Sequence, residues 1–437
     1  MKSAPQRLAL RGDLLDFVAA PALDSSAMHG VRWRPEHWLL VEDGRVRGAQ
    51  PASQAPDASW ERIDHSGRLI LPGFIDTHVH SAQLDVMASY GAELIDWLNT
   101  YTFPAERAWA DPAFARAGSE RFLDALLAHG TTSAVVFPTV HKVSVDALFV
   151  AAAQRGMRIV AGKVLMDRHA PDGLRDDVDT AERECRDLIA RWHGKGRSAY
   201  AVTVRFAPTS TPAQLAMAAR LCADDPTLYL QTHVAENRAE VAWVGELFPD
   251  ARSYLDVYDR AGLLHSRSVL AHGIWLDDAD RRRLRDTAGQ IAFCPLSNLF
   301  LGSGLFDWQR SADAGVKVSL ASDVGGGTSL SMQRTMADAY KVQALAGRKL
   351  GAWAMLHAAT RGAAAHLQLE LEIGSFDAGR CADVCVWDWA VGEVAQRRID
   401  VARDLHERVF AWLTLGDERC LVAAYVAGVQ LHRRAAP

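Results

Sequence analysis

Two histidines close an apolar run near residue 80 of this 437-residue chain, a placement that suits metal chemistry. The run spells LPGFIDTHVH from Leu71 to His80. Side chains two residues apart in a β-strand point the same way, so His78 and His80 can aim both imidazoles at one point. Taken alone, the pair fits a metal site and the polar capping of a loop equally well.

Three further residues of metal-binding type follow later apolar runs. His233 stands in QTHVAE, His272 in LAHG and Asp323 in ASD. Separately, His272 fits a core histidine and Asp323 a helix N-cap. Together they supply the imidazole and carboxylate ligands that suit Zn²⁺ and, less selectively, Fe²⁺. The joint occurrence at the ends of four different runs favours one metal site.

The elements that would bring these residues together are strands of a barrel. Short apolar runs alternate with helical patterns, which indicates βα units around a parallel sheet. A doubly wound sheet is the alternative, but a (β/α)8 TIM barrel over residues 72–372 gathers strand-end residues at one mouth, where such barrels place active sites. The eight runs are Leu71–Asp76, Ser133–Phe137, Arg158–Leu165, Ala201–Phe206, Leu228–His233, Ser268–His272, Gln290–Cys294 and Val316–Ser322.

The two chain ends predict a second, smaller domain. Residues 1–71 and 373–437 carry short strand patterns, including a hairpin signal at Asp43-Gly44. Because chain termini often lie close together, we expect both ends to pair into one small β-sandwich domain.

Composition excludes several classes of protein. Hydrophobic residues make up 49% and charged residues 23%, which rules out a disordered chain or a fibre. The net charge of −5, without a Lys/Arg-rich run, predicts no nucleic-acid partner. There is no secretory signal and no run of 18 apolar residues, so we expect a cytoplasmic protein without a membrane partner.

The motifs resemble the amidohydrolase superfamily, and within it the guanine deaminase family. The superfamily pattern is PGFIDTHVH with the later T-H-x-x-E, H-G and S-D segments. The likeness is dense from about residue 71 to 345, and departs at Ser81-Ala82 and His169. The stretches similar to guanine deaminases are Gln83–Asp85, Ala88–Gly91, Trp97–Glu106, Gly162–Val164, Met166–Arg168, Arg205–Pro208 and Ser322–Met332.

The resemblance implies a mononuclear metal site. It implies one Zn²⁺ per chain, with Fe²⁺ as the alternative. Two-metal relatives generally use a lysine of the fourth strand, and the run from Ala201 to Phe206 has none; Lys163, in the third run, is expected to be structural. The implied ligands are His78, His80, His233 and Asp323.

The resemblance also implies the reaction and its catalytic residues. Water activated by the metal attacks C2 of guanine, and ammonia leaves with xanthine as the product. Glu236 moves protons to the ring nitrogen N3 and the leaving group, Asp323 or Glu236 acts as general base, and His272 bonds the water and the tetrahedral intermediate.

Three other residues are implied to recognise the substrate beside Glu236 and His272. Arg205 offers donors to the 6-oxo group, Phe206 packs on the ring face, and the Gln83 amide matches a mixed ring edge. The loop over residues 89–104, with Trp97, forms either a wall or lid of the site or ordinary packing. Two alternatives remain: a deaminase of another aminated heterocycle (an oxidised guanine, a pteridine or a triazine), and an inactive binding protein. Because relatives are commonly homodimers, the resemblance also implies a homodimer, and the reaction that it implies belongs to purine catabolism.

Overall fold

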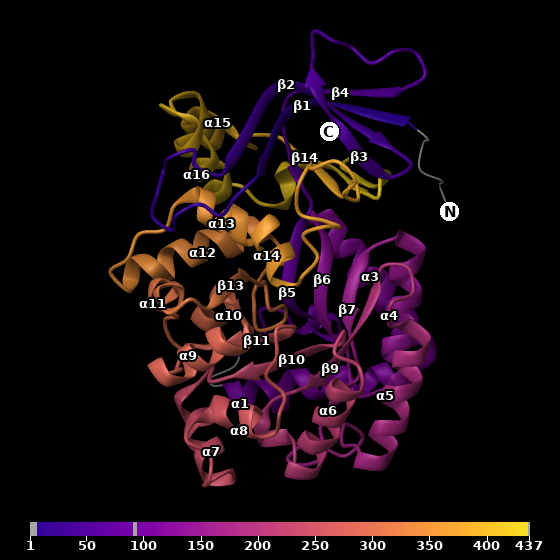
Figure 1. Ribbon diagram of the computed structural model, residues 1–437, viewed down its shortest axis with the longest axis vertical. Helices are drawn as coiled ribbons and strands as arrows, with labels where there is room; N and C mark the ends of the chain where they lie inside the picture. Colours follow the sequence, from indigo (N-terminus) through magenta and orange to yellow (C-terminus); the bar gives the residue numbers. More distant parts are fainter. Residues whose placement is uncertain (1–6, 91–93, 436–437) are drawn as a thin grey trace.

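The computed structural model describes residues 7–90 and 94–435, with a barrel and a smaller sheet above it (Figure 1). The prediction of a (β/α)8 barrel with a small β-domain from both chain ends is confirmed. The domain boundaries at residues 71/72 and 372/373 stay predictions. No helix within the described ranges is both long and apolar enough to cross a membrane.

The barrel strands run parallel and follow one another around the barrel in sequence order. A short ninth strand, β8 (Val164–Leu165), pairs with β9. Where the last strand meets the first, the Thr77 hydroxyl donates to the Leu320 carbonyl over 2.9 Å. The main strands are β5 (Phe74–His80), β6 (Thr131–Phe137), β7 (Arg158–Ala161), β9 (Ser198–Val204), β10 (Tyr229–Val234), β11 (Ser268–His272), β12 (Gln290–Phe293) and β13 (Lys317–Leu320).

One expected strand is divided. The run from Arg158 to Leu165 forms β7 and β8, with Gly162 and Lys163 between them. At Gly162 the chain approaches the neighbouring strand so closely that a Cβ atom would lie 1.8 Å from the Ala201 carbonyl oxygen. Only glycine permits that approach, so the break follows from local crowding.

Helices cover the outside of the barrel (Figure 1). Their apolar faces pack on the strands around residues such as Phe122, Leu148 and Leu215. Smaller side chains, including Val135, Ala201 and Ala292, fill the interior. The covering helices are α3 (Pro112–Ala128), α4 (Lys142–Arg155), α5 (Val178–Trp192), α6 (Pro212–Asp224), α7 (Arg238–Leu247), α8 (Tyr254–Arg260), α9 (Asp278–Thr287), α11 (Trp308–Asp313), α12 (Met332–Leu345), α13 (Ala352–Ala358) and α14 (Arg361–His366).

Short helices occupy the loops at the carboxyl ends of the strands. The segment after β5 is helical almost throughout its described part, including a π-helical turn, η2, over Leu98–Thr102. Such turns are frequent at functional sites. The other short helices are η1 (Ser81–Val86), α1 (Leu94–Trp97), α2 (Phe103–Arg107), η3 (Ala108–Ala110), η4 (Ala207–Thr209) and α10 (Pro295–Phe300).

The small domain is one seven-stranded mixed sheet in the order β16-β15-β14-β4-β1-β2-β3, so its strands form a single hydrogen-bonded path. The expected hairpin joins β2 and β3, with positive φ at both Asp43 and Gly44. Helices α15 (Glu393–Asp400), α16 (Leu405–Leu415) and η5 (Glu418–Cys420) complete the C-terminal part. The strands are β1 (Arg7–Phe17), β2 (Val31–Glu42), β3 (Arg45–Pro51), β4 (Glu61–Pro72), β14 (Val384–Trp387), β15 (Leu421–Val426) and β16 (Val429–Arg433).

The small sheet connects directly to the strand that carries the first two histidines. β4 ends at Pro72 and β5 begins at Phe74, so only Gly73 separates them. Because β5 starts beside the small sheet, its carboxyl end and the histidines point to the opposite end of the barrel.

Candidate active site

Three imidazoles and one carboxylate converge at the carboxyl ends of the strands. Nε2 of His80 lies 3.2 Å from Nε2 of His78 and 3.3 Å from Nε2 of His233. Oδ1 of Asp323 lies 3.2 Å from Nε2 of His78 and 3.4 Å from Nε2 of His80. The structure therefore brings all four sequence-predicted ligand residues together.

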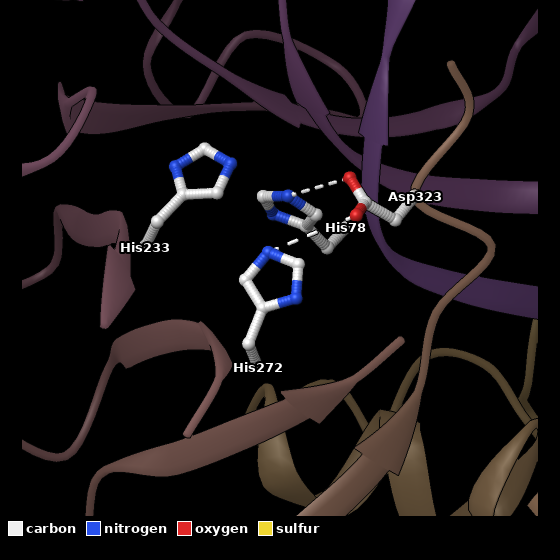
Figure 2. A group of neighbouring side chains, drawn as sticks. All are labelled: His78, His233, His272 and Asp323. Carbon is white, nitrogen blue, oxygen red and sulfur yellow. Dashed lines mark ion pairs between the residues drawn. The ribbon is translucent and has the colours of Figure 1, made fainter. Parts of the chain in front are cut away.

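The backbone turns two of the site residues inward. His272 ends β11 with φ of +72°, and Asp323 follows β13 with φ of +50°. Residues other than glycine rarely adopt this left-handed conformation, and functional sites are among the places where they cluster. Figure 2 shows the result: His78, His233, His272 and Asp323 face one another, with ligand atoms that all lie within 4.8 Å.

This cluster has the donor chemistry of a metal site. The Nδ1 atom of His233 donates to the Arg205 carbonyl at 2.6 Å, which leaves a lone pair on the inward Nε2. Burial lowers the pKa of His78 to about 4 and the pKa of His233 well below its usual value, which favours the neutral, ligating forms. Facing Nε2 atoms cannot all act as donors to one another, so a cation between them fits the arrangement.

Asp323 is held as a carboxylate. Burial alone would raise its pKa, but His78 and His80 outweigh burial and keep that pKa well below the usual range. A charged carboxylate beside neutral imidazoles is the ligand form for a divalent ion.

Glu236 and His272 form the second part of the site. Nε2 of His272 lies 3.3 Å from Oε2 of Glu236 and 3.7 Å from Oδ2 of Asp323. Burial raises the pKa of Glu236 to about 7, against the opposing effect of His272. Burial lowers the pKa of His272, but the two carboxylates outweigh it and the net shift is upward. A carboxyl group with a pKa near neutrality can both accept and donate protons.

The segment beginning with α10 supports these groups, and sequence reasoning missed it. The Ser297 hydroxyl donates to Oδ2 of Asp323 at 2.6 Å, and Asn298 Oδ1 accepts from Nδ1 of His272 at 2.8 Å. The Ser303 hydroxyl donates to Oε1 of Glu236 at 2.9 Å. The available signal was the polar pair Ser297-Asn298, shortly after the apolar run that ends at Cys294.

The expected recognition residues line one cavity beside the metal cluster. Gln83, Arg205 and Phe206 face it together with Glu236 and His272. From residues 89–104, Trp97 and Leu98 contribute a wall; residues 91–93 lie outside the described part of the chain.

Two further charged residues, Glu106 and Lys163, have not yet been placed relative to the site. Glu106, which sequence reasoning gave no role, is completely buried beside Arg205 and Gln83. Lys163 lies away from the metal cluster, where Nζ donates to Asp176 at 2.7 Å. Its position fits the structural role expected for it.

Comparison with known proteins gives the family. The amidohydrolase family matches residues 69–429. A guanine deaminase of Escherichia coli (strain K12) is 42% identical over 430 residues, covering 98% of each chain. The structure of E. coli guanine deaminase has a TM-score of 0.93 at 41% identity, covering 98% of this chain and 99% of that one. A C. acetobutylicum guanine deaminase with guanine in its active site has a TM-score of 0.86 at 26% identity, covering 98% and 100%.

The barrel and its clustered histidines are those of a metal-dependent hydrolase, and the chain belongs to the amidohydrolase family. Within that family, relatives that match nearly the full length include guanine deaminases.

Proposed function

We propose that this enzyme deaminates guanine to xanthine and ammonia by hydrolysis at the site described above. The observation that carries the proposal is the buried Glu236–His272 pair, set between the metal cluster and the cavity lined by Gln83, Arg205 and Phe206. The guanine deaminase relatives support the same substrate.

The proposed cofactor is one Zn²⁺ per chain, with Fe²⁺ as the alternative. When bound, the ion supplies Lewis acidity that makes a water molecule a competent nucleophile near neutral pH. The residues that would hold it are His78, His80, His233 and Asp323.

Glu236 is proposed to carry the protons. One oxygen is fixed by Ser303 and the other faces His272, so the carboxyl group has a defined direction. With a pKa near 7 it can take a proton from the nucleophilic water and deliver it to N3. It can then take the proton of the new hydroxyl on C2 and deliver it to the leaving amine, so that ammonia departs and the C2 carbonyl forms. Asp323, held as a carboxylate, is the alternative base for the first step.

His272 is proposed to stabilise the tetrahedral intermediate. Its raised pKa favours the charged form, in which Nε2 donates a hydrogen bond to the oxygen that becomes negative. Asn298 accepts from Nδ1 and so keeps Nε2 directed at the reacting atoms.

We propose that other side chains lining the cavity recognise the substrate. Arg205 donates to the 6-oxo group, Gln83 pairs with a ring edge, and Phe206 covers a ring face. The homodimer, the cytoplasmic location and a place in purine catabolism stay predictions.

The test is ammonia release from a panel that contains guanine, 8-oxoguanine, a pterin and an aminotriazine, with metal analysis of the same sample. We expect guanine to be consumed most efficiently, xanthine as product, and about one zinc per chain. Preferred turnover of another heterocycle would assign the alternative substrate class, and binding of guanine without turnover would indicate an inactive binder.

A further inference from the structure

A carboxylate behind the cavity wall contacts two of the three recognition side chains. Glu106 lies on α2, is completely buried and does not line the cavity itself. Both of its oxygens accept from Nη1 of Arg205, at 2.8 and 2.6 Å. Oε1 also accepts from Nε2 of Gln83, at 2.9 Å.

The ion pair fixes the direction of Arg205. The side chain of Arg205 is 4% exposed, and its guanidinium lies 5.2 Å from the centre of the Phe103 ring. Buried ion pairs give little net stability compared with apolar packing, but they hold their groups in one geometry. The pair therefore orients the donors that Arg205 offers to the cavity.

The same carboxylate fixes the Gln83 amide. Because a carboxylate only accepts, the atom of Gln83 that faces Glu106 must be Nε2. The amide oxygen of Gln83 is consistent with this orientation, since Oε1 accepts from the Gly325 N–H at 3.2 Å. The amide cannot flip without losing both bonds, so the donor and acceptor that remain for a ligand have fixed places.

We propose that Glu106 is the positioning residue for substrate recognition: it orients Arg205 and Gln83 together, and so sets the preference for a purine with a 6-oxo group. The inference rests on the proposed function, because it assigns Arg205 to that oxygen. Glu106 touches no reacting atom and acts only through its two partners.

The experiment compares guanine with 2-aminopurine, which lacks the 6-oxo group, in the wild-type holoenzyme and in Glu106→Gln. The KM for guanine and the competitive inhibition constant of 2-aminopurine are measured together. We expect KM for guanine to rise by about tenfold or more while kcat changes by less than about threefold and metal content is unchanged. The constant for 2-aminopurine should rise clearly less than KM for guanine, because that ligand makes no contact at position 6 and is affected only through Gln83.

A matched control is Glu372→Gln, which removes the partner of Arg158 in another ion pair. That variant should keep the wild-type ratio of the two constants. In the background of Arg205→Ala, the guanine effect of Glu106→Gln should shrink, because its main route of action is gone.

If Glu106→Gln does not fold, the same constants are measured for Glu106→Asp. This variant keeps the negative charge, but its shorter side chain moves the carboxylate away from both partners. A folded variant that leaves the ratio unchanged, or weakens both ligands equally, overturns the inference. Failure of the wild-type enzyme to act on guanine would instead overturn the proposed function.

Discussion

Burial and two neighbouring side chains determine how the carboxyl group of Glu236 is oriented. Ser303 fixes one oxygen, His272 faces the other, and the backbone N–H of Glu236 donates to Oε2 of Glu240 at 3.0 Å. The carboxyl group is thus oriented without being a member of the metal cluster. Its loss should therefore affect proton transfer and leave metal binding intact.

Glu236→Gln should retain the metal and lose at least about 100-fold in kcat, because an amide of the same shape cannot exchange the protons. Metal analysis and steady-state kinetics on one preparation test this. Turnover at the wild-type rate would remove Glu236 from its acid–base role.

Arg205→Ala should lower kcat/KM for guanine by about 100-fold, a loss of about 3 kcal/mol in transition-state stabilisation. The metal content should stay at the wild-type level. Because Glu106 would then be buried without its cation, we also expect the thermal midpoint to fall. Unchanged kinetics would show that guanine binds without Arg205.

At the residue scale, the sequence revealed groups whose spacing is local and missed those whose partners are distant. The i, i+2 spacing of His78 and His80 is visible in any strand, and strand-end positions marked the other ligand residues. Glu106 carries no such signal, because its partner Arg205 lies 99 residues away. Only the fold shows that the two side chains meet.

At the scale of the elements, the short helix α10 is important for the geometry of the site. It follows β12, begins at Pro295, and together with the residues just beyond it supports Asp323, His272 and Glu236. A substitution in this segment should therefore change chemistry more than substrate affinity.

Asn298→Ala should remove the acceptor that helps to raise the pKa of His272. Since the charged imidazole is the proposed donor, activity should be lost at a lower pH on the alkaline side than in wild type. Asn298→Asp places a negative charge there and should move the alkaline limit the other way. The pH profile of kcat for both variants tests this, and shifts in the same direction would contradict it.

The positions of the barrel strands could be predicted from the sequence, but the break within one of them could not. All eight apolar runs overlap barrel strands, because each strand is buried on both faces and leaves a continuous apolar signal. The division of the third run at Gly162 depends on contact with Ala201 of another strand. The helical structure over Leu98–Arg107 was likewise not predicted from the sequence, since its packing partners are tertiary.

For the whole molecule, partly buried histidines outside the site should make stability depend on pH. Burial lowers the pKa of His366 to about 3, and its Nδ1 lies 2.8 Å from Oγ of Ser319. The unfolded chain binds a proton near pH 6.5 and the folded chain does not. Stability is therefore complete above that pH and declines as the pH falls toward 3.

His366→Gln should flatten this decline by up to about 1.4 kcal/mol per pH unit between pH 6 and 4, while lowering stability at pH 7.5. Denaturant unfolding at several pH values measures the slope, and His29→Gln, at an exposed histidine, is the matched control. An undiminished slope in His366→Gln would show that other groups dominate.

The junction at Gly73 restricts how chains of this fold can change in length. A Cβ atom at Gly73 would lie 2.2 Å from Oγ1 of Thr132, and its N–H donates to the Asp383 carbonyl at 2.9 Å. The strand is thus fixed to both sheets at this residue. One inserted residue between here and His78 would turn both histidines to the other face of the strand. Insertions and deletions are therefore expected in the loops at the barrel mouth, and none in these few residues.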